Sequence, residues 1–273
     1  MNIMKKLLLA MAASVMALSC TRKESPKILV LYYSQNGGTK VVAEEIGNRL
    51  GADIAEIVPV CPYDGHFEET IERCRKEMEA GEIPEIEPVA CDLKAYDVVF
   101  LGYPVWFGTY APPVAGLLTA ADFSGKKIVP FCTFGSGGLD SSVKDLKEKE
   151  PEAEILPGYG VRAARIEAVP GEVDRFLKEG GFIEGEYEKY GDFSEMRPAS
   201  EAEAVIFDAA VAGYPMIHAT AKNVSSRAVT DGTEYLFEAE DAPDPRFPGD
   251  PRTIKVYVLD LEGQEPVFTQ VLR

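Results

Sequence analysis

The chain has 273 residues, 46% of them hydrophobic, which is enough to form a buried core in one large or two small domains. Its formal net charge of −17 excludes the basic surface by which proteins bind nucleic acid. Only two histidines are present, and no pair of cysteines has CxxC spacing, so the sequence does not predict a metal site.

The first twenty residues have the pattern of an export signal. Lys5 and its basic neighbour precede an apolar stretch, residues 7–18, which is too short to span a bilayer as a mature helix. The stretch ends in Ala-Leu-Ser-Cys, which resembles a bacterial lipoprotein signal; a plain secretory signal is the alternative. We expect a signal peptide over residues 1–19, a lipid anchor on Cys20 and a tether over residues 20–26. The protein would then be exported and held at a bacterial membrane, facing the periplasm or the cell surface.

Residues 27–181 alternate between apolar runs typical of buried strands and segments with helical spacing. Strands joined by helices form a parallel sheet that is covered on both faces. We therefore expect an α/β domain with a doubly wound, five-stranded parallel sheet. The predicted strands are residues 28–33, 53–58, 97–102, 127–133 and 153–156, and the predicted helices are residues 39–50, 64–80, 111–120, 138–150 and 171–178.

Three turns follow strands of this sheet at their carboxyl ends, where doubly wound folds bind ligands. The first turn, residues 34–39, contains two glycines, and the helix start that follows offers free N–H groups and a positive dipole end to a phosphate. Ser34, Asn36 and Thr39 add short polar side chains. An ordinary capped turn is the alternative, because neither GxxxxGK[ST] nor GxGxxG is present. Our hypothesis is that this turn holds the phosphate of flavin mononucleotide (FMN).

The second turn, residues 103–110, concentrates aromatic side chains at the mouth of a strand and includes Trp106, the only tryptophan. Such rings are costly to expose, and a flat ring system is a natural stacking partner for them. An aromatic patch or a protein contact is the alternative. The third turn, residues 133–138, is rich in glycine. By itself it is more typical of a loop that leads into a helix than of a ligand-binding loop.

Together the three turns resemble the flavodoxin family. The first matches its S/T-x-x-G-x-T phosphate loop, the second matches a G-x-P-x-W-x-G-T segment beginning at Gly102, and the third matches T-x-G-S-G-G. The resemblance covers residues 27–181 and implies a flavodoxin-like fold with non-covalently bound FMN. The first turn would hold the phosphate, Trp106 with Tyr103 or Tyr110 would flank the ring system, and backbone groups of the other turns would bind its polar edge. The expected cofactor-binding residues are Ser34, Gln35, Asn36, Gly37, Gly38, Thr39, Tyr103, Pro104, Val105, Trp106, Gly108, Thr109, Thr133, Phe134, Gly135 and Gly138.

Flavin supplies the redox chemistry itself, so the sequence predicts no catalytic side chain. Flavodoxin-like proteins include electron carriers and nicotinamide-dependent quinone reductases. The chain has no nicotinamide fingerprint, and export would separate it from the cytoplasmic nicotinamide pool. We therefore favour an FMN-binding electron-transfer protein of the cell envelope, with redox proteins or a quinone as partners. An FMN-dependent NAD(P)H:quinone-type oxidoreductase and a flavin-free binding or scaffold module are the alternatives.

The α/β pattern ends near Phe182. A polar linker over residues 182–198 leads to a small α+β domain over residues 199–273, with a helix followed by strands of period two. The stretch VTDGTEY, residues 229–235, resembles the hairpin of the cystatin family. Alanine and threonine replace the glutamine and valine that inhibition requires, so we expect an accessory or partner-contacting module rather than a protease inhibitor. The predicted helix is residues 199–212, and the predicted strands are residues 217–229, 233–239, 253–261 and 267–272.

Overall fold

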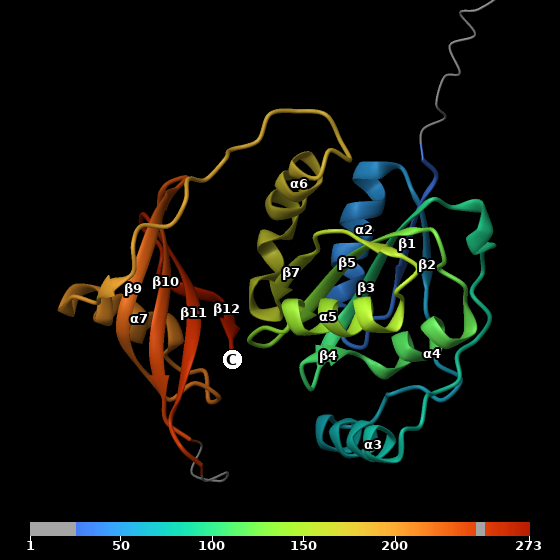
Figure 1. Ribbon diagram of the computed structural model, residues 1–273, viewed down its shortest axis with the longest axis horizontal. Helices are drawn as coiled ribbons and strands as arrows, with labels where there is room; N and C mark the ends of the chain where they lie inside the picture. Colours follow the sequence, from blue (N-terminus) through green and yellow to red (C-terminus); the bar gives the residue numbers. More distant parts are fainter. Residues whose placement is uncertain (1–25, 244–248) are drawn as a thin grey trace, which may run out of the picture.

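The computed structural model describes residues 26–243 and 249–273, which form two sheets, each with its own helices, joined by an irregular segment (Figure 1). The predicted signal peptide and Cys20 lie outside these residues. Within the described ranges, no helix has both the length and the apolar character needed to cross a membrane.

The first sheet is parallel, with strand order β2-β1-β3-β5 and with β6 and β7 at the far edge beside β5. The order reverses between β1 and β3, which makes this position the switch point of a doubly wound fold. The expected fold is confirmed, except that the fifth strand is interrupted at Pro157, which has no N–H to donate to a neighbouring strand. The strands are β1 (Ile28–Tyr32), β2 (Asp53–Glu56), β3 (Val98–Trp106), β5 (Lys127–Phe134), β6 (Glu154–Ile155) and β7 (Tyr159–Arg162).

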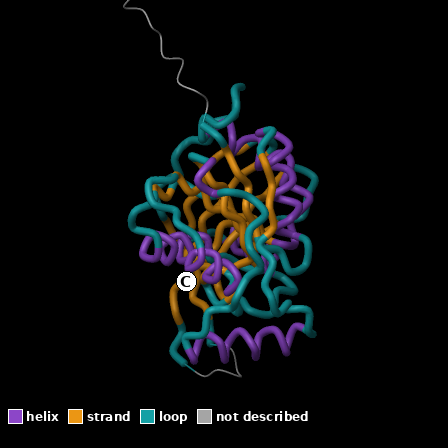
Figure 2. Tube along the Cα trace, turned by 90° about the vertical axis from the view of Figure 1, so that its right-hand side faces the viewer, coloured by secondary structure: helices purple, strands orange, loops and turns teal. Residues whose placement is uncertain are grey.

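Helices cover both faces of this sheet. The core on one face is completed by α2 and α6, and the core on the other face by α4 and α5. Helix α3 lies apart at the lower end of the molecule (Figures 1 and 2). The helices are α2 (Gly38–Leu50), α3 (Phe67–Ala80), α4 (Pro112–Ala120), α5 (Leu139–Lys149) and α6 (Val169–Glu179), with short 3₁₀ turns η1 (Leu93–Ala95) and η2 (Ala163–Ala168).

The second turn is a β-hairpin rather than the expected loop. Strand β3 continues to Trp106 and pairs with β4 (Thr109–Tyr110). Phe107 and Gly108 take the two central positions with φ angles of 51° and 82°. A two-residue hairpin turn of type I′ requires positive φ at both positions. Phenylalanine is unusual at the first of them, which is why the sequence did not predict the hairpin.

The second sheet is antiparallel, with strand order β12-β11-β10-β9-β8. Helix α7 packs on one face of it, where Phe207 and Phe237 are fully buried with ring centroids 5.2 Å apart. The expected helix and antiparallel meander are confirmed, and the likeness to the cystatin fold stays a prediction. The elements are β8 (Arg197–Pro198), α7 (Glu201–Val211), β9 (Ala219–Val229), β10 (Gly232–Asp241), β11 (Arg252–Leu261) and β12 (Val267–Leu272).

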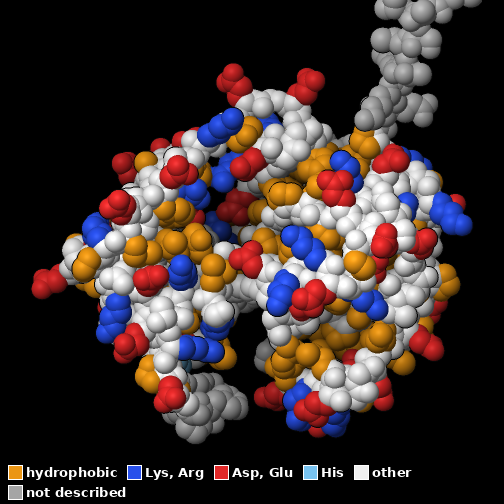
Figure 3. Space-filling model, viewed as in Figure 1, with side chains coloured by type: hydrophobic (Ala, Val, Ile, Leu, Met, Phe, Trp, Pro, Cys, Tyr) orange, Lys and Arg blue, Asp and Glu red, His pale blue; other side chains and the backbone are white. Residues whose placement is uncertain are grey.

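The irregular segment before β8 runs along the antiparallel sheet on its way from α6. Phe193 packs edge-on against Tyr257 with ring centroids 5.9 Å apart, and the backbone N–H of Ser194 donates to the carbonyl of Ser226. A cavity of about 550 Å³ separates this sheet from α6 and is lined by arginine and glutamate side chains of both domains. Figure 3 shows a hollow between the two halves of the molecule.

Candidate functional site

The three turns meet at the carboxyl ends of β1, β3 and β5. The hydroxyl groups of Thr39 and Thr133 are 2.9 Å apart and buried, which joins the first turn to the third. The hydroxyl of Ser141, the third residue of α5, donates to the carbonyl of Gly108. This bond joins the helix that follows the third turn to the hairpin. The three turns, residues 34–39, 103–110 and 133–138, therefore lie against one another at this edge of the sheet, and we call them the cradle.

The first turn ends in a helix start with free donors. Gly37 has a left-handed φ of 83°, and α2 begins at the next residue. The Ser34 hydroxyl accepts a hydrogen bond from the Lys40 N–H at 3.2 Å. The N–H groups of Gly38 and Thr39 have no helical acceptor, and within the described ranges no other protein atom accepts from them. These two donors and the helix dipole provide a site for an anion.

Gln35 has a structural role that the sequence did not reveal. Its side-chain amide donates to the carbonyl of Tyr63 at 2.9 Å and to the hydroxyl of Thr70 at 3.3 Å. The side chain therefore ties the first turn to the segment leading into α3, and a cofactor-binding role of Gln35 stays a prediction. Asn36 is exposed beside it.

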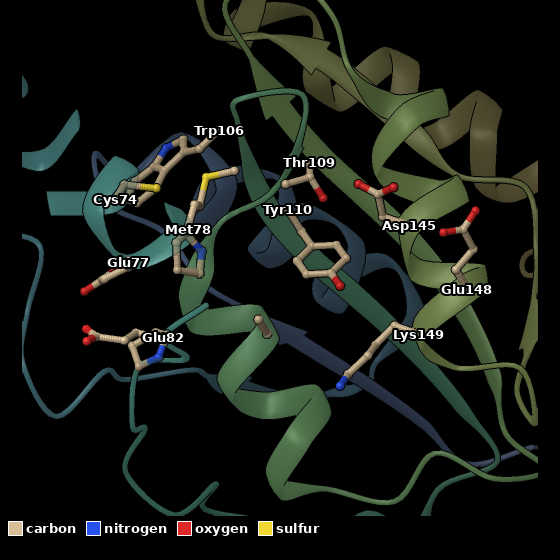
Figure 4. A pocket seen from close by; sticks show the side chains of 13 residues that line it. Cys74, Glu77, Met78, Glu82, Trp106, Thr109, Tyr110, Asp145, Glu148 and Lys149 are labelled. Carbon is tan, nitrogen blue, oxygen red and sulfur yellow. The ribbon is translucent and has the colours of Figure 1, made fainter. Parts of the chain in front are cut away.

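Trp106 is half-buried and held edge-on by two tyrosines. Its ring centroid is 6.0 Å from that of Tyr33 and 5.3 Å from that of Tyr63. The side chains of Trp106 and Tyr110 also line a cavity of about 450 Å³ among α3, α4 and α5, where Trp106 lies beside Cys74 and Tyr110 toward α5 (Figure 4).

The structure does not bring the Tyr103 side chain to the surface where the three turns meet. Its side chain is completely buried beneath α5, and its hydroxyl lies 3.1 Å from the hydroxyl of Ser142. Burial raises the pKa of the Tyr103 phenol, which therefore stays neutral. Phe134 is likewise packed in the core, so only its backbone belongs to the cradle. Trp106 and Tyr110 are left as the aromatic side chains predicted to flank the ring system.

Sequence reasoning missed Phe107 as a site residue. It lies at the tip of the hairpin, its side chain is 54% exposed, and its φ is positive. A positive φ is strained for a bulky residue, and such strain gathers at functional sites. The sequence signal that could identify Phe107 is its position directly after Trp106 in the aromatic second turn.

Arg162, at the end of β7, was also missed. It is 9% exposed, and its guanidinium donates to the carbonyl of Gly135 in the third turn and to the carbonyl of Phe268 in β12, both at 2.9 Å. The guanidinium lies 3.3 Å from the ring centroid of Phe268. No pattern in the sequence around Arg162 indicates that its side chain hydrogen-bonds to two domains at once.

The second and third turns approach closely at Gly138, where α5 begins. Its φ is 119°, and a Cβ atom at this position would lie 2.5 Å from a methyl group of Val105. This contact holds the hairpin against the third turn. The predicted residues whose backbone or side chain borders the cradle are Ser34, Gly37, Gly38, Thr39, Trp106, Gly108, Thr133, Gly135 and Gly138, while Pro104, Val105 and Thr109 shape the hairpin.

The four cysteines of the described residues, Cys61, Cys74, Cys91 and Cys132, are free thiols. Cys132 is completely buried behind the third turn, where burial raises the pKa of its thiol. Among the residues that the structure describes, no group of histidine, cysteine and carboxylate side chains is arranged to hold a metal ion.

The comparison with known proteins agrees with this geometry. Residues 27–168 match the family model described as flavodoxin, which is more than half of the chain. The chain therefore belongs to the flavodoxin family. No protein of curated function matches it.

Solved structures resemble this chain over little more than half of its length. A protein of Bacteroides uniformis ATCC 8492 assigned as a flavoprotein is 24% identical with a TM-score of 0.50, over 55% of this chain and 99% of that one. One from Bacteroides eggerthii DSM 20697 is 30% identical with a TM-score of 0.47, over 53% and 95%. The flavoprotein of Lactobacillus acidophilus NCFM, solved in complex with FMN, is 24% identical with a TM-score of 0.46, over 55% and 99%.

Proposed function

We propose that this protein binds FMN in the cradle and transfers electrons. The observation that carries the proposal is the convergence of the three turns, joined by the Thr39–Thr133 and Ser141–Gly108 hydrogen bonds. Membership of the flavodoxin family supports it. Bound FMN would supply the redox chemistry, and the protein would hold and tune it.

The residues present fit this group in chemistry and shape. The free N–H groups of Gly38 and Thr39 and the dipole of α2 suit a phosphate, and the glycine turn leaves room for it. The ring of Trp106 is fixed by its tyrosine neighbours and suits a flat ring system. Backbone groups of the third turn suit the polar edge of that ring system.

We also propose that the protein is located in the cell envelope. This proposal rests on the signal pattern of residues 1–19 and on Cys20 as the lipidated residue. A lipid-anchored protein outside the cytoplasm would exchange electrons with envelope redox proteins or a membrane quinone. Purified protein that oxidises NADPH steadily in the presence of a quinone would contradict the carrier role and favour a reductase.

FMN is expected to bind to the purified apoprotein and to stabilise it. At a free FMN concentration of about 100 times Kd, linkage adds roughly 2.7 kcal/mol to the free energy of unfolding. For a domain of this size, that raises Tm by roughly 5–10 °C. The measurements are quenching of FMN fluorescence and thermal unfolding, with riboflavin as the control because it lacks the phosphate. Absence of both quenching and a Tm shift would refute the proposed function.

The final reduction step of the bound flavin is expected to have a lower potential than that of free FMN. Loss of a signal containing Lys5 and Lys6 would make the net charge near −19, and negative charge disfavours an anionic reduced flavin. Potentiometric titration measures this step. Added salt is expected to raise the potential, because it screens the surface charges. A step at or above the potential of free FMN would contradict the prediction.

A further inference from the structure

The third turn of the cradle is in direct contact with the C-terminal domain. The backbone N–H of Val271, in β12, donates to the carbonyl of Ser136 at 2.6 Å, and the guanidinium of Arg273 donates to the Ser136 hydroxyl at 3.0 Å. In Figure 1, the end of β12 lies toward the elements that carry this turn. An edge strand of one domain thus pairs with the turn that borders the candidate flavin site of the other.

These contacts orient two peptide groups. Arg162 donates to the Gly135 carbonyl, and Val271 donates to the Ser136 carbonyl. A trans peptide is planar, so the N–H that follows each carbonyl points in the opposite direction. The N–H groups of Ser136 and Gly137 therefore point away from the atoms that hold the carbonyls. In the described part of the chain, neither N–H has a protein acceptor.

Gly137 is required by the close approach of β12. A Cβ atom at this position would lie 2.3 Å from the backbone carbonyl oxygen of Val271, well inside any tolerated contact. Its φ lies outside the left-handed region, so an alanine here would suffer no backbone strain of its own. The glycine is therefore explained by the docking of the C-terminal domain.

Arg162 adds a second link at the same place. It is nearly buried, and among the described residues no carboxylate forms an ion pair with it. A buried charge without an opposite charge is costly unless its hydrogen bonds are made. Two of these bonds go to the carbonyls of Gly135 and Phe268, one in each domain. The guanidinium makes both of these bonds only while the two domains stay together.

We propose that the C-terminal domain contributes to flavin binding by holding the third turn in position. In that position the N–H groups of Ser136 and Gly137 are free to donate to the acceptor atoms at the polar edge of the flavin. The inference rests on the proposed function. Flavin binding and domain docking then share the same peptide groups, so each strengthens the other. Arg162 is a positioning residue that links the two domains through Gly135.

Gly137→Ala tests the coupling, because its Cβ separates β12 from the turn. We expect FMN affinity to fall at least about tenfold and hydrogen exchange of the Val271 amide to accelerate even without flavin. In the unmodified protein, FMN is expected to slow exchange of that amide. Gly171→Ala is the matched control: a Cβ there meets nothing within 4 Å, its φ is also outside the left-handed region, and it should leave both measurements unchanged.

Arg162→Lys gives a second measurement in case Gly137→Ala fails to fold. Lysine keeps the charge but lacks the planar fork that reaches two carbonyls at once. It should also weaken FMN binding and accelerate exchange at Val271. The inference is overturned if the unmodified protein binds FMN but both variants bind it equally well, or if FMN leaves exchange at Val271 unchanged. If the unmodified protein does not bind FMN at all, the proposed function fails and the inference fails with it.

Discussion

Replacing Trp106 by alanine is expected to weaken FMN binding by about 10- to 100-fold, which corresponds to roughly 1.4–2.7 kcal/mol. The indole offers a large flat surface, and its edge-on contacts with Tyr33 and Tyr63 fix it in place before any ligand arrives. A fixed ring loses little freedom on stacking, so most of the contact energy appears as affinity. Fluorescence titration of apoprotein with FMN measures the change.

Two further variants separate stacking from support of the hairpin. Trp106→Phe keeps a flat ring and should recover much of the affinity. Phe107→Ala removes the exposed ring at the hairpin tip and leaves Trp106 with its tyrosine neighbours, so it tests whether the tip also contributes. Thermal unfolding of each apoprotein shows whether the variant is merely less stable. If Trp106→Ala binds FMN as tightly as the unmodified protein, the ring system lies elsewhere.

The strands and helices of the parallel sheet could be predicted because their signals are local. Apolar runs such as residues 28–33 and 127–133 are bounded by turns, and the helices between them have clear spacing. The order of turns along the chain then fixes which of them meet at the carboxyl edge. The cradle therefore follows from sequence once the fold class is known.

The orientation of the Tyr103 side chain can be predicted from the sequence only if the end of strand β3 is placed correctly. Val99 and Leu101 face the core beneath α4 and α5, and the alternation of a strand places Tyr103 on the same side. The prediction ended the strand at Gly102 and so treated Tyr103 as a loop residue. The actual strand continues to Trp106, because the hairpin partner β4 pairs with its last residues.

The contact between the third turn and β12 could not be predicted from the sequence. Ser136 and Val271 are separated by most of the second half of the chain, and neither is unusual in its own segment. In the sequence, Gly137 is one of several glycines in a glycine-rich turn. In the structure, a side chain at this position would clash with the carbonyl of Val271. The docking of one domain on another depends on surface shape, which no periodic pattern records.

Gly138→Ala is expected to destabilise the apoprotein by about 2–4 kcal/mol. The residue has a φ of 119°, which costs an L-amino acid roughly 1–3 kcal/mol, and its new Cβ would lie 2.5 Å from a methyl group of Val105. The clash separates the hairpin from the third turn, so FMN affinity should fall as well. Denaturant unfolding followed by Trp106 fluorescence reports this region directly, because it is the only tryptophan.

A control glycine and a second substitution show whether the clash with Val105 causes the stability loss of Gly138→Ala. Gly125 also has a positive φ, 72°, but a Cβ there meets nothing within 4 Å, so Gly125→Ala should show the backbone cost alone. Adding Val105→Ala to Gly138→Ala removes the methyl group that clashes and should recover part of the lost stability, a coupling that the double-mutant cycle measures. If Gly138→Ala costs no more than Gly125→Ala and the cycle shows no coupling, the hairpin and the third turn do not depend on each other. The cradle would then lack the rigidity that a preformed flavin site needs, because the wall carrying Trp106 would be free to move relative to the turn facing the polar edge.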